Sequence, residues 1–209
     1  MNNININKNT SQSGRSMIEM LGVLAIVGVL SVGGIAGYSK AMQKFKINKT
    51  AEQISHIVTS IRTLYAQQTS YEGLTENTAI EMGIIPTEMG TNAISGKILT
   101  SFKGQVYIRD FPYWGKNIFL INVTGLPKEA CVSLSTHDWG SPSSSGLLAL
   151  TISNGAMTGT NVGGFDQEEN QSGFIRSIGK NIPLPLNVAT AVNGCNCPDD
   201  NCTVGFTFQ

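Results

Sequence analysis

Residues 20–39 read MLGVLAIVGVLSVGGIAGYS, and none of these twenty side chains is charged. Only Ser31 and Ser39 are conventionally polar. An α-helix rises about 1.5 Å per residue, so a run of this length covers the ~30 Å hydrocarbon core of a bilayer. A buried helix of a soluble domain is usually shorter and amphipathic. The length and uniformity of the run therefore favour a membrane-spanning helix.

The flanking residues argue against a secretory signal peptide that would be removed with its apolar part. Residues 1–14, MNNININKNTSQSG, are polar and contain one charge, at Lys8. No A-x-A-like cleavage site follows the apolar run, which passes directly into YSKAMQKFKINKT at 38–50. We therefore expect the apolar segment to remain in the mature protein, with any cleavage falling before it.

The helical pattern continues beyond the apolar segment. The next apolar residues recur at the spacing of one stripe of a 3.6-residue helix; they are Ile47, Ala51, Ile54, Ile57, Val58, Ile61, Leu64 and Tyr65. No proline interrupts residues 15–67. One continuous helix over this range would be about 80 Å long. We expect its first half to project and its second half to pack its stripe on a sheet.

The remaining residues show short helical and strand patterns. We expect helices at 75–82, 127–135 and 187–193, and strands at 105–110, 117–123, 147–153 and 203–208. The first two strands are expected to be joined by a turn through Pro112 and Gly115. Stretches rich in Gly, Ser and Asn at 140–146 and 154–173 are expected to be loops. A helix followed by mixed strands and small helices predicts an α+β fold with an antiparallel sheet.

Composition argues against several classes of function. The 209 residues include 14 Lys+Arg and 14 Asp+Glu, so the net charge is zero and gives no basic footprint for nucleic acid. The sequence contains no P-loop, dinucleotide-binding, zinc-protease or serine-hydrolase motif. We expect a protein that is not an enzyme and uses no cofactor.

The four cysteines are Cys131, Cys195, Cys197 and Cys202. An even number in an exported domain predicts two disulfides. A bridge between Cys195 and Cys197 would close a strained small ring, so Cys202 should pair with one of them and Cys131 with the other. The alternative is a zinc site of four thiolates. Such sites usually offer two well-spaced pairs, unlike this crowded trio with one distant cysteine, so we expect no metal.

The stretch Gly14-Arg15-Ser16-Met17-Ile18-Glu19-Met20-Leu21 resembles the prepilin peptidase site of type IV pilins. In that family a glycine precedes the cleaved bond, and a glutamate is the fifth residue of the mature chain. The resemblance implies cleavage between Gly14 and Arg15, methylation of the new N-terminus at Arg15, and charge pairing by Glu19 during assembly. Arg15 stands where most members have Phe, Met or Leu.

Three later segments resemble the type IVb, thin-pilus-like branch of that family. They are IEMGIIPTEM at 80–89, IFLINVTGLPKEACVSL at 118–134 and the C-terminal AVNGC…TVGFTF. The branch has a disulfide of the Cys131–Cys195 kind, which implies Cys197–Cys202 as the second bridge. The resemblance also implies the pilin fold, in which a long N-terminal helix packs on the antiparallel sheet of a globular head.

The resemblance implies a domain organisation as well. Residues 1–14 would be a leader peptide, 15–42 the membrane-spanning and filament-core half of the helix, and 43–209 a periplasmic, later extracellular, head. The precursor would lie in inner-membrane lipid and polymerise with copies of itself into an extracellular filament. Its other partners would be a prepilin peptidase, an inner-membrane assembly platform and an outer-membrane secretin.

Several glycines in the apolar segment have no side chain to hold a neighbouring helix away. Gly33 and Gly37 form a GxxxG pair. We expect helix packing at four positions in particular: Gly22, Gly28, Gly33 and Gly37.

Alternatives remain open at this stage. Lys40, Lys44, Lys46 and Lys49 follow the apolar segment, and the positive-inside rule would place this cluster in the cytoplasm, whereas pilin topology places it in the periplasm. A minor pilin or a type II secretion pseudopilin would share the N-terminal motif. A single-pass membrane-anchored enzyme or receptor would share the apolar helix, but it would keep an uncleaved N-terminus and have a pocket of convergent polar groups.

Overall fold

The computed structural model describes residues 17–92, 95–113, 116–140, 145–154 and 184–209. The chain divides into two compact units, Met1–Lys44 and Phe45–Gln209. The first helix, α1 (Met17–Tyr65), contributes residues to both units. It accounts for nearly all of the continuous helix expected over 15–67, and residues 15 and 16 lie outside the described part.

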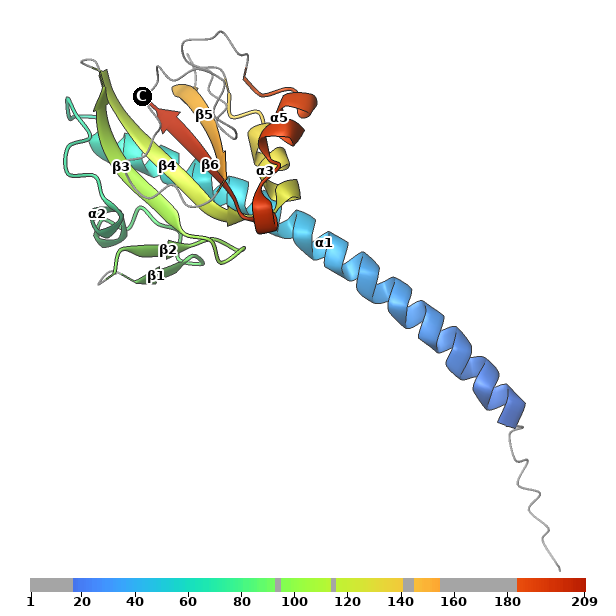
Figure 1. Ribbon diagram of the computed structural model, residues 1–209. Coiled ribbons are helices and arrows are strands. Elements are labelled where there is room, and N and C mark those ends of the chain that lie inside the picture. Colours follow the sequence, from blue (N-terminus) through green and yellow to red (C-terminus); the bar gives the residue numbers. More distant parts are fainter. Residues whose placement is uncertain (1–16, 93–94, 114–115, 141–144, 155–183) are drawn as a thin grey trace, which may run out of the picture. The chain divides into compact units, whose positions relative to one another are not determined.

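The second unit is built on a four-stranded antiparallel sheet with the order β3-β4-β6-β5 (Figure 1). Its strands are β3 (Val106–Tyr113), β4 (Lys116–Leu126), β5 (Leu147–Asn154) and β6 (Cys202–Phe208). Strand β6 lies in the interior of the sheet, where Phe206 pairs with Ile121 of β4 and with Leu150 of β5. This sheet and the long helix confirm the expected α+β fold.

The core forms where the second part of α1 runs along one face of this sheet (Figure 1). Ile57 and Ile61 of α1 are completely buried, in one cluster with Phe119 of β4 and Phe206 of β6. Alternate residues of a strand point to one face, so Phe119, Ile121 and Val123 all join this core. Burying each large apolar side chain contributes roughly 1.5–3 kcal/mol, which makes this contact the main source of stability in the second unit.

The buried stripe of α1 differs from the expected one at its edges. Leu64 is 48% exposed, because it lies at the margin of the stripe in the last turn of the helix. Thr50 and Gln53 are buried instead. The Thr50 hydroxyl donates to the Lys46 carbonyl at 2.9 Å, which satisfies its polar group within the helix.

Short helices begin where the sequence supplies caps. Helix α2 (Glu76–Glu81) follows Thr75, whose hydroxyl accepts the backbone N–H of Thr78 at 3.2 Å. Asn187 caps α5 (Val188–Gly194) in the same way. Helix α3 (Lys128–Ser135) begins after Pro127. All three lie within or beside the ranges expected for them.

Two features differ from the expected strands and turns. Strand β3 continues through Pro112, which pairs with Asn117, so the expected turn through Pro112 is wrong. Gly115, the other residue of that expected turn, lies outside the described residues. A proline is tolerated there because β3 is an edge strand. A small hairpin of β1 (Gly90–Asn92) and β2 (Lys97–Leu99) was not expected. The residues between Cys197 and Cys202 form a 3-10 turn, η1 (Pro198–Asp200).

The structure describes only part of the two loops expected at 140–146 and 154–173. Asn154, expected to open a loop, is the last residue of β5. Residues 141–144 and 155–173 of the expected loops lie outside the described part.

Candidate functional site

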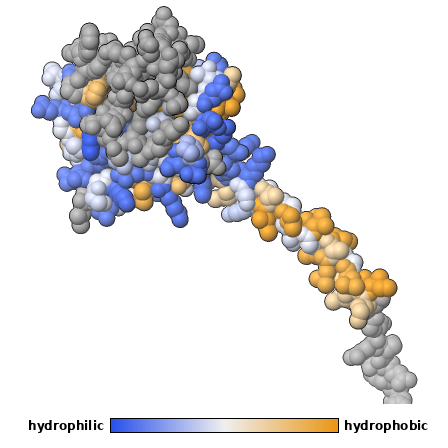
Figure 2. Space-filling view, in the orientation of Figure 1, coloured by the Kyte–Doolittle hydropathy of each residue, from blue (hydrophilic) through white to orange (hydrophobic). Residues whose placement is uncertain are grey.

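The first part of α1 presents an apolar surface with no cover from the described chain. Its most apolar 18-residue window has a mean hydropathy of 2.2, and none of it is buried. Its large apolar side chains are exposed, such as Leu24, Val29 and Val32. The face of this part of the helix seen in Figure 2 is predominantly hydrophobic. An isolated surface of this kind is unfavourable in water, so it requires lipid or other apolar helices.

The polar side chains in this apolar segment are satisfied by the helix itself. The Ser31 hydroxyl donates to the Val27 carbonyl at 2.7 Å, and the Ser39 hydroxyl donates to the Ile35 carbonyl at 3.0 Å. In hydrocarbon every polar group must find a partner within the protein, and these two serines meet that condition. The hydroxyl groups of these two serines therefore need no water.

Glu19 lies in the first turn of α1, at the start of the apolar surface, and is exposed. A carboxylate is favoured there by the positive end of the helix dipole. Gly14 and Arg15, the expected cleavage and methylation positions, lie outside the described residues.

The glycines of the apolar segment leave open space on the helix. Apart from the adjoining residues and the nearby backbone of α1 itself, no heavy atom of the described residues lies within 4 Å of the position that a Cβ would occupy at Gly22, Gly28, Gly33 or Gly37. Gly33 and Gly37 are four residues apart and therefore lie on one side of the helix, where they expose the backbone. A second helix could approach this side more closely than it could a side covered by leucine or valine.

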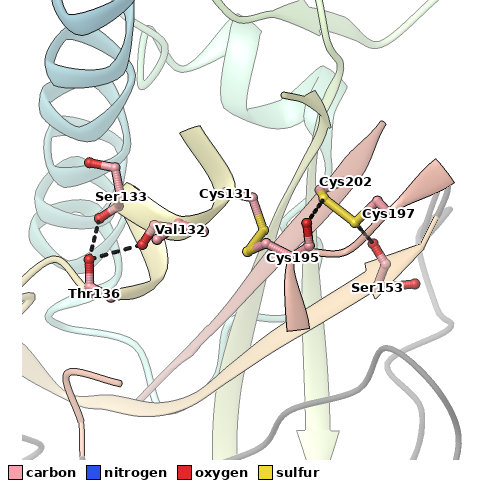
Figure 3. The surroundings of a disulfide bond; sticks show 8 residues. All are labelled: Cys131, Val132, Ser133, Thr136, Ser153, Cys195, Cys197 and Cys202. Atoms are coloured by element: carbon pink, nitrogen blue, oxygen red, sulfur yellow. Dashed lines mark hydrogen bonds between the residues drawn. A yellow bond between two sulfur atoms is a disulfide. The ribbon is translucent and has the colours of Figure 1, made fainter. Parts of the chain in front are cut away.

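Two disulfides fix the C-terminal part of the second unit (Figure 3). One joins Cys131 of α3 to Cys195, 64 positions away, and the other joins Cys197 to Cys202 at the start of β6. These are the pairs that the resemblance implies. Because the four cysteines are paired in two disulfides, no thiolate is left for the alternative zinc site.

A cavity of about 260 Å³ lies beside the loop that follows α1; it is lined by Ser70, Tyr71, Glu72, Asp110, Phe111, Asn117 and Ile118. Several of its polar groups already have partners in the fold. The Asn117 amide donates to the Thr69 carbonyl, and the Ser70 hydroxyl accepts the backbone N–H of Glu72 at 3.4 Å. Burial raises the pKa of the Tyr71 phenol, and a hydrogen bond with Arg62 opposes that shift. The cavity walls therefore serve mainly to join this loop to β3 and β4.

Sequence reasoning missed one buried polar contact, between Glu76 of α2 and the edge of β3. Glu76 pairs with the guanidinium of Arg109 and accepts the backbone N–H of Ile108 at 3.0 Å. The acceptor and donor are 32 positions apart, and no local sequence pattern marks Glu76 as buried.

Comparison with known proteins gives matches of one kind. The family model described as Bundlin matches residues 39–203. The major structural subunit of bundle-forming pilus from Escherichia coli O127:H6 is 28% identical over 129 residues, which cover 62% of this chain and 66% of that protein. The toxin coregulated pilin of Vibrio cholerae is 25% identical over 139 residues, which cover 62% of this chain and 59% of that protein. The matched region thus spans about two thirds of these relatives or less.

The crystal structure of TcpA, a type IV pilin from Vibrio cholerae El Tor biotype, has a similar fold. The TM-score is 0.55 at 18% identity, and the likeness covers 78% of this chain and 99% of that one. It confirms the expected pilin fold. Because the family model matches well over half of the sequence, this chain belongs to the bundlin family.

Proposed function

We propose that this chain is the structural subunit of a type IVb pilus and not an enzyme. The observation that carries the proposal is the apolar first part of α1, which nothing in the described chain covers. In the precursor, inner-membrane lipid would solvate this surface. In the filament, the same surface of other copies would replace the lipid, so that one helix serves both as anchor and as filament core.

Processing is the first step of the proposed mechanism. A prepilin peptidase would cleave the bond between Gly14 and Arg15 and remove the polar leader, 1–14. The new α-amino group, at Arg15, would be the site of methylation. Residues 15–42 would then form the anchor, and 43–209 the periplasmic head, whose disulfides form in that oxidising compartment.

Assembly is the second step. Glu19 would pair with the N-terminal ammonium of an adjacent copy as the apolar helices come together. A lone carboxylate in an apolar core is costly, so the paired stagger of two subunits is favoured over unpaired ones. Close packing at Gly22, Gly28, Gly33 and Gly37 would add contact area between the helices. An assembly platform and a secretin would extract and export the filament, whose use would be adhesion, aggregation or DNA transfer.

The mass of the chain purified from membranes tests the proposal. Loss of residues 1–14, with or without one methyl group on Arg15, is the expected result. An intact leader in cells that contain an active prepilin peptidase would contradict it and would favour a single-pass membrane enzyme or receptor. The number of copies per filament separates a major from a minor pilin, and the type IVb segments of the head argue against a type II secretion pseudopilin.

A further inference from the structure

The four lysines that follow the apolar segment fall into two groups. Lys46 and Lys49, in the second unit, have partners: the Lys46 ammonium lies 5.9 Å from the centre of the Phe102 ring, and the Lys49 ammonium lies 2.8 Å from Glu88. Lys40 and Lys44, in the first unit, are exposed, and the structure shows no ion pair for either among the described residues.

The spacing of Lys40 and Lys44 favours an anionic partner. They are four residues apart on a helix, so both ammonium groups extend from the same side and repel each other. Residues 38–51 contain no acidic side chain that could offset this charge. The nearest aromatic side chain within the first unit is that of Tyr38, which is 67% exposed.

The length of the helix sets the depth of these residues. Glu19 and Lys40 are 21 positions apart, which corresponds to about 31 Å along the helix and matches the ~30 Å hydrocarbon core. If Glu19 marks one boundary of the core, Lys40 lies at the other and Lys44 about 6 Å further out, at the level of the lipid headgroups. Tyr38 then lies in the interfacial zone where tyrosine is enriched.

We propose that Lys40 and Lys44 form a binding site for the phosphate of an anionic phospholipid in the outer leaflet of the inner membrane. This inference rests on the proposed function, because it requires that the first part of α1 spans a bilayer. It also accounts for cations on the side of the membrane that the positive-inside rule disfavours. There Lys40 and Lys44 hold the anchor at a fixed depth through contacts with lipid headgroups. They give up these lipid contacts when the subunit leaves the membrane.

The test uses the full chain reconstituted into bilayers, with spin-labelled phosphatidylglycerol and phosphatidylcholine as probes. The wild-type chain should associate with phosphatidylglycerol about thirtyfold more strongly at low salt, the factor that corresponds to about 2 kcal/mol, or about 1 kcal/mol for each of the two lysines at the surface. The double variant Lys40→Gln/Lys44→Gln should reduce the ratio to about one. Lys40→Arg/Lys44→Arg should retain the preference, because the charge is kept.

The matched control is Lys97→Gln/Lys103→Gln, which removes the same charge from exposed positions of the second unit. It should retain the wild-type preference. Equal association of both lipids with the wild-type chain, or an unchanged preference in Lys40→Gln/Lys44→Gln, would overturn the inference.

An alkaline wash separates this inference from the proposed function. A chain that is stripped from bilayers of either lipid has no membrane span, and both proposals then fail. A chain that stays in both bilayers without preferring phosphatidylglycerol refutes the lipid site alone.

Discussion

Glu76 and Ile108 are joined by a hydrogen bond in which the carboxylate of α2 accepts a backbone N–H of strand β3 at 3.0 Å. The neighbouring Asp110 N–H donates to the Leu74 carbonyl at 3.2 Å. Strand β3 is at the edge of the sheet, where open N–H groups can pair with another chain. Residues 74–76 occupy two of these groups and so protect part of this edge.

Replacing Glu76 with Gln should lower the free energy of unfolding of the head by about 1–3 kcal/mol, because the Glu76 side chain is only 7% exposed and its charge pairs with Arg109. Denaturant unfolding of the purified chain measures this change. Glu81→Gln, at an exposed position of the same helix, is the control and should change stability by less than about 0.5 kcal/mol. Equal effects of the two substitutions would show that the Glu76 contacts contribute nothing.

The two disulfides should differ in their contribution to stability. Their cysteines are 64 and 5 positions apart. By loop entropy, removing Cys131–Cys195 should cost about 4 kcal/mol and removing Cys197–Cys202 about 2 kcal/mol. The paired Cys→Ser variants can be compared by denaturant unfolding under oxidising conditions. A larger loss from the short loop would contradict this order.

The pair of Lys49 and Glu88 predicts a pH dependence. Their hydrogen bond holds the pKa of Glu88 below its usual 4.5 and raises the pKa of Lys49 above 10.5. The stability from the lowered carboxyl pKa is present above about pH 4.5 and is lost as the pH falls through the lower, folded-state pKa. The stability from the raised ammonium pKa is present below about pH 10.5 and is lost as the pH rises through the folded-state pKa.

Glu88→Gln should therefore lower the melting temperature slightly near neutral pH and have no effect at about pH 2. Carboxyl NMR titration gives the direct measurement. In Lys49→Met the midpoint of Glu88 should move up toward 4.5, whereas Lys97→Met should leave it unchanged. If the titration midpoint of Glu88 did not change in Lys49→Met, the hydrogen bond between Lys49 and Glu88 would be absent in solution.

Neutralising Glu19 separates folding from assembly. Glu19→Ala should leave the melting temperature of the head unchanged, because Glu19 is an exposed residue of the first unit. Electron microscopy of cells should show that filaments are lost. Glu52→Ala, which removes a carboxylate whose side chain is 74% exposed further along α1, is the control and should leave filaments intact. Normal filaments from Glu19→Ala would refute its proposed role.

Bulky residues in place of Gly33 and Gly37 should impair filament assembly without impairing folding. Outside the nearby backbone of α1, the described residues place no heavy atom within 4 Å of either Cβ position. Each glycine also costs a helix about 1 kcal/mol relative to alanine. Gly33→Leu/Gly37→Leu should therefore keep or increase the helix content by circular dichroism while reducing the number of filaments. Ser31→Leu adds bulk on the other side of the helix, about 160° around it from Gly33 and about 120° from Gly37, and should be tolerated better. The glycine contact would be excluded if the two variants assembled equally well.

The periodicity of apolar residues was sufficient to predict the long helix and the main strands, but it did not predict the shortest strands. In the longer elements the apolar pattern repeats often enough to show which face is buried. This holds for the stripe from Ile47 to Tyr65 and for the strands around Phe119 and Phe206. Strands β1 and β2 have three residues each, too few for an alternation to appear. Pro112 is a strong turn signal, but whether a proline fits in a strand depends on that strand's place in the sheet, which is a property of the whole fold.

The apolar segment of the candidate site could be predicted from the sequence, whereas the tertiary contacts of the charged side chains could not. The uncharged length of 20–39 indicates an apolar surface without any knowledge of the fold, and the structure leaves that surface open. The contacts of Glu76 with Ile108, of Lys46 with Phe102 and of Lys49 with Glu88 each join residues at least 32 positions apart, which only tertiary packing brings together. The sequence shows four closely spaced lysines. Only the folded chain shows that Lys46 and Lys49 contact other side chains, whereas Lys40 and Lys44 have no ion pair within the described part of the chain.

The position of β6 has a consequence for the order in which the head matures. Within the described sheet, β5 pairs only with β6, which comes last along the chain. A polypeptide delivered across a membrane from its N-terminal end would therefore expose the unfinished edges of β4 and β5 until 202–208 arrived. A copy truncated before 202–208 would therefore lack the strand that joins β4 to β5, and its sheet would stay divided.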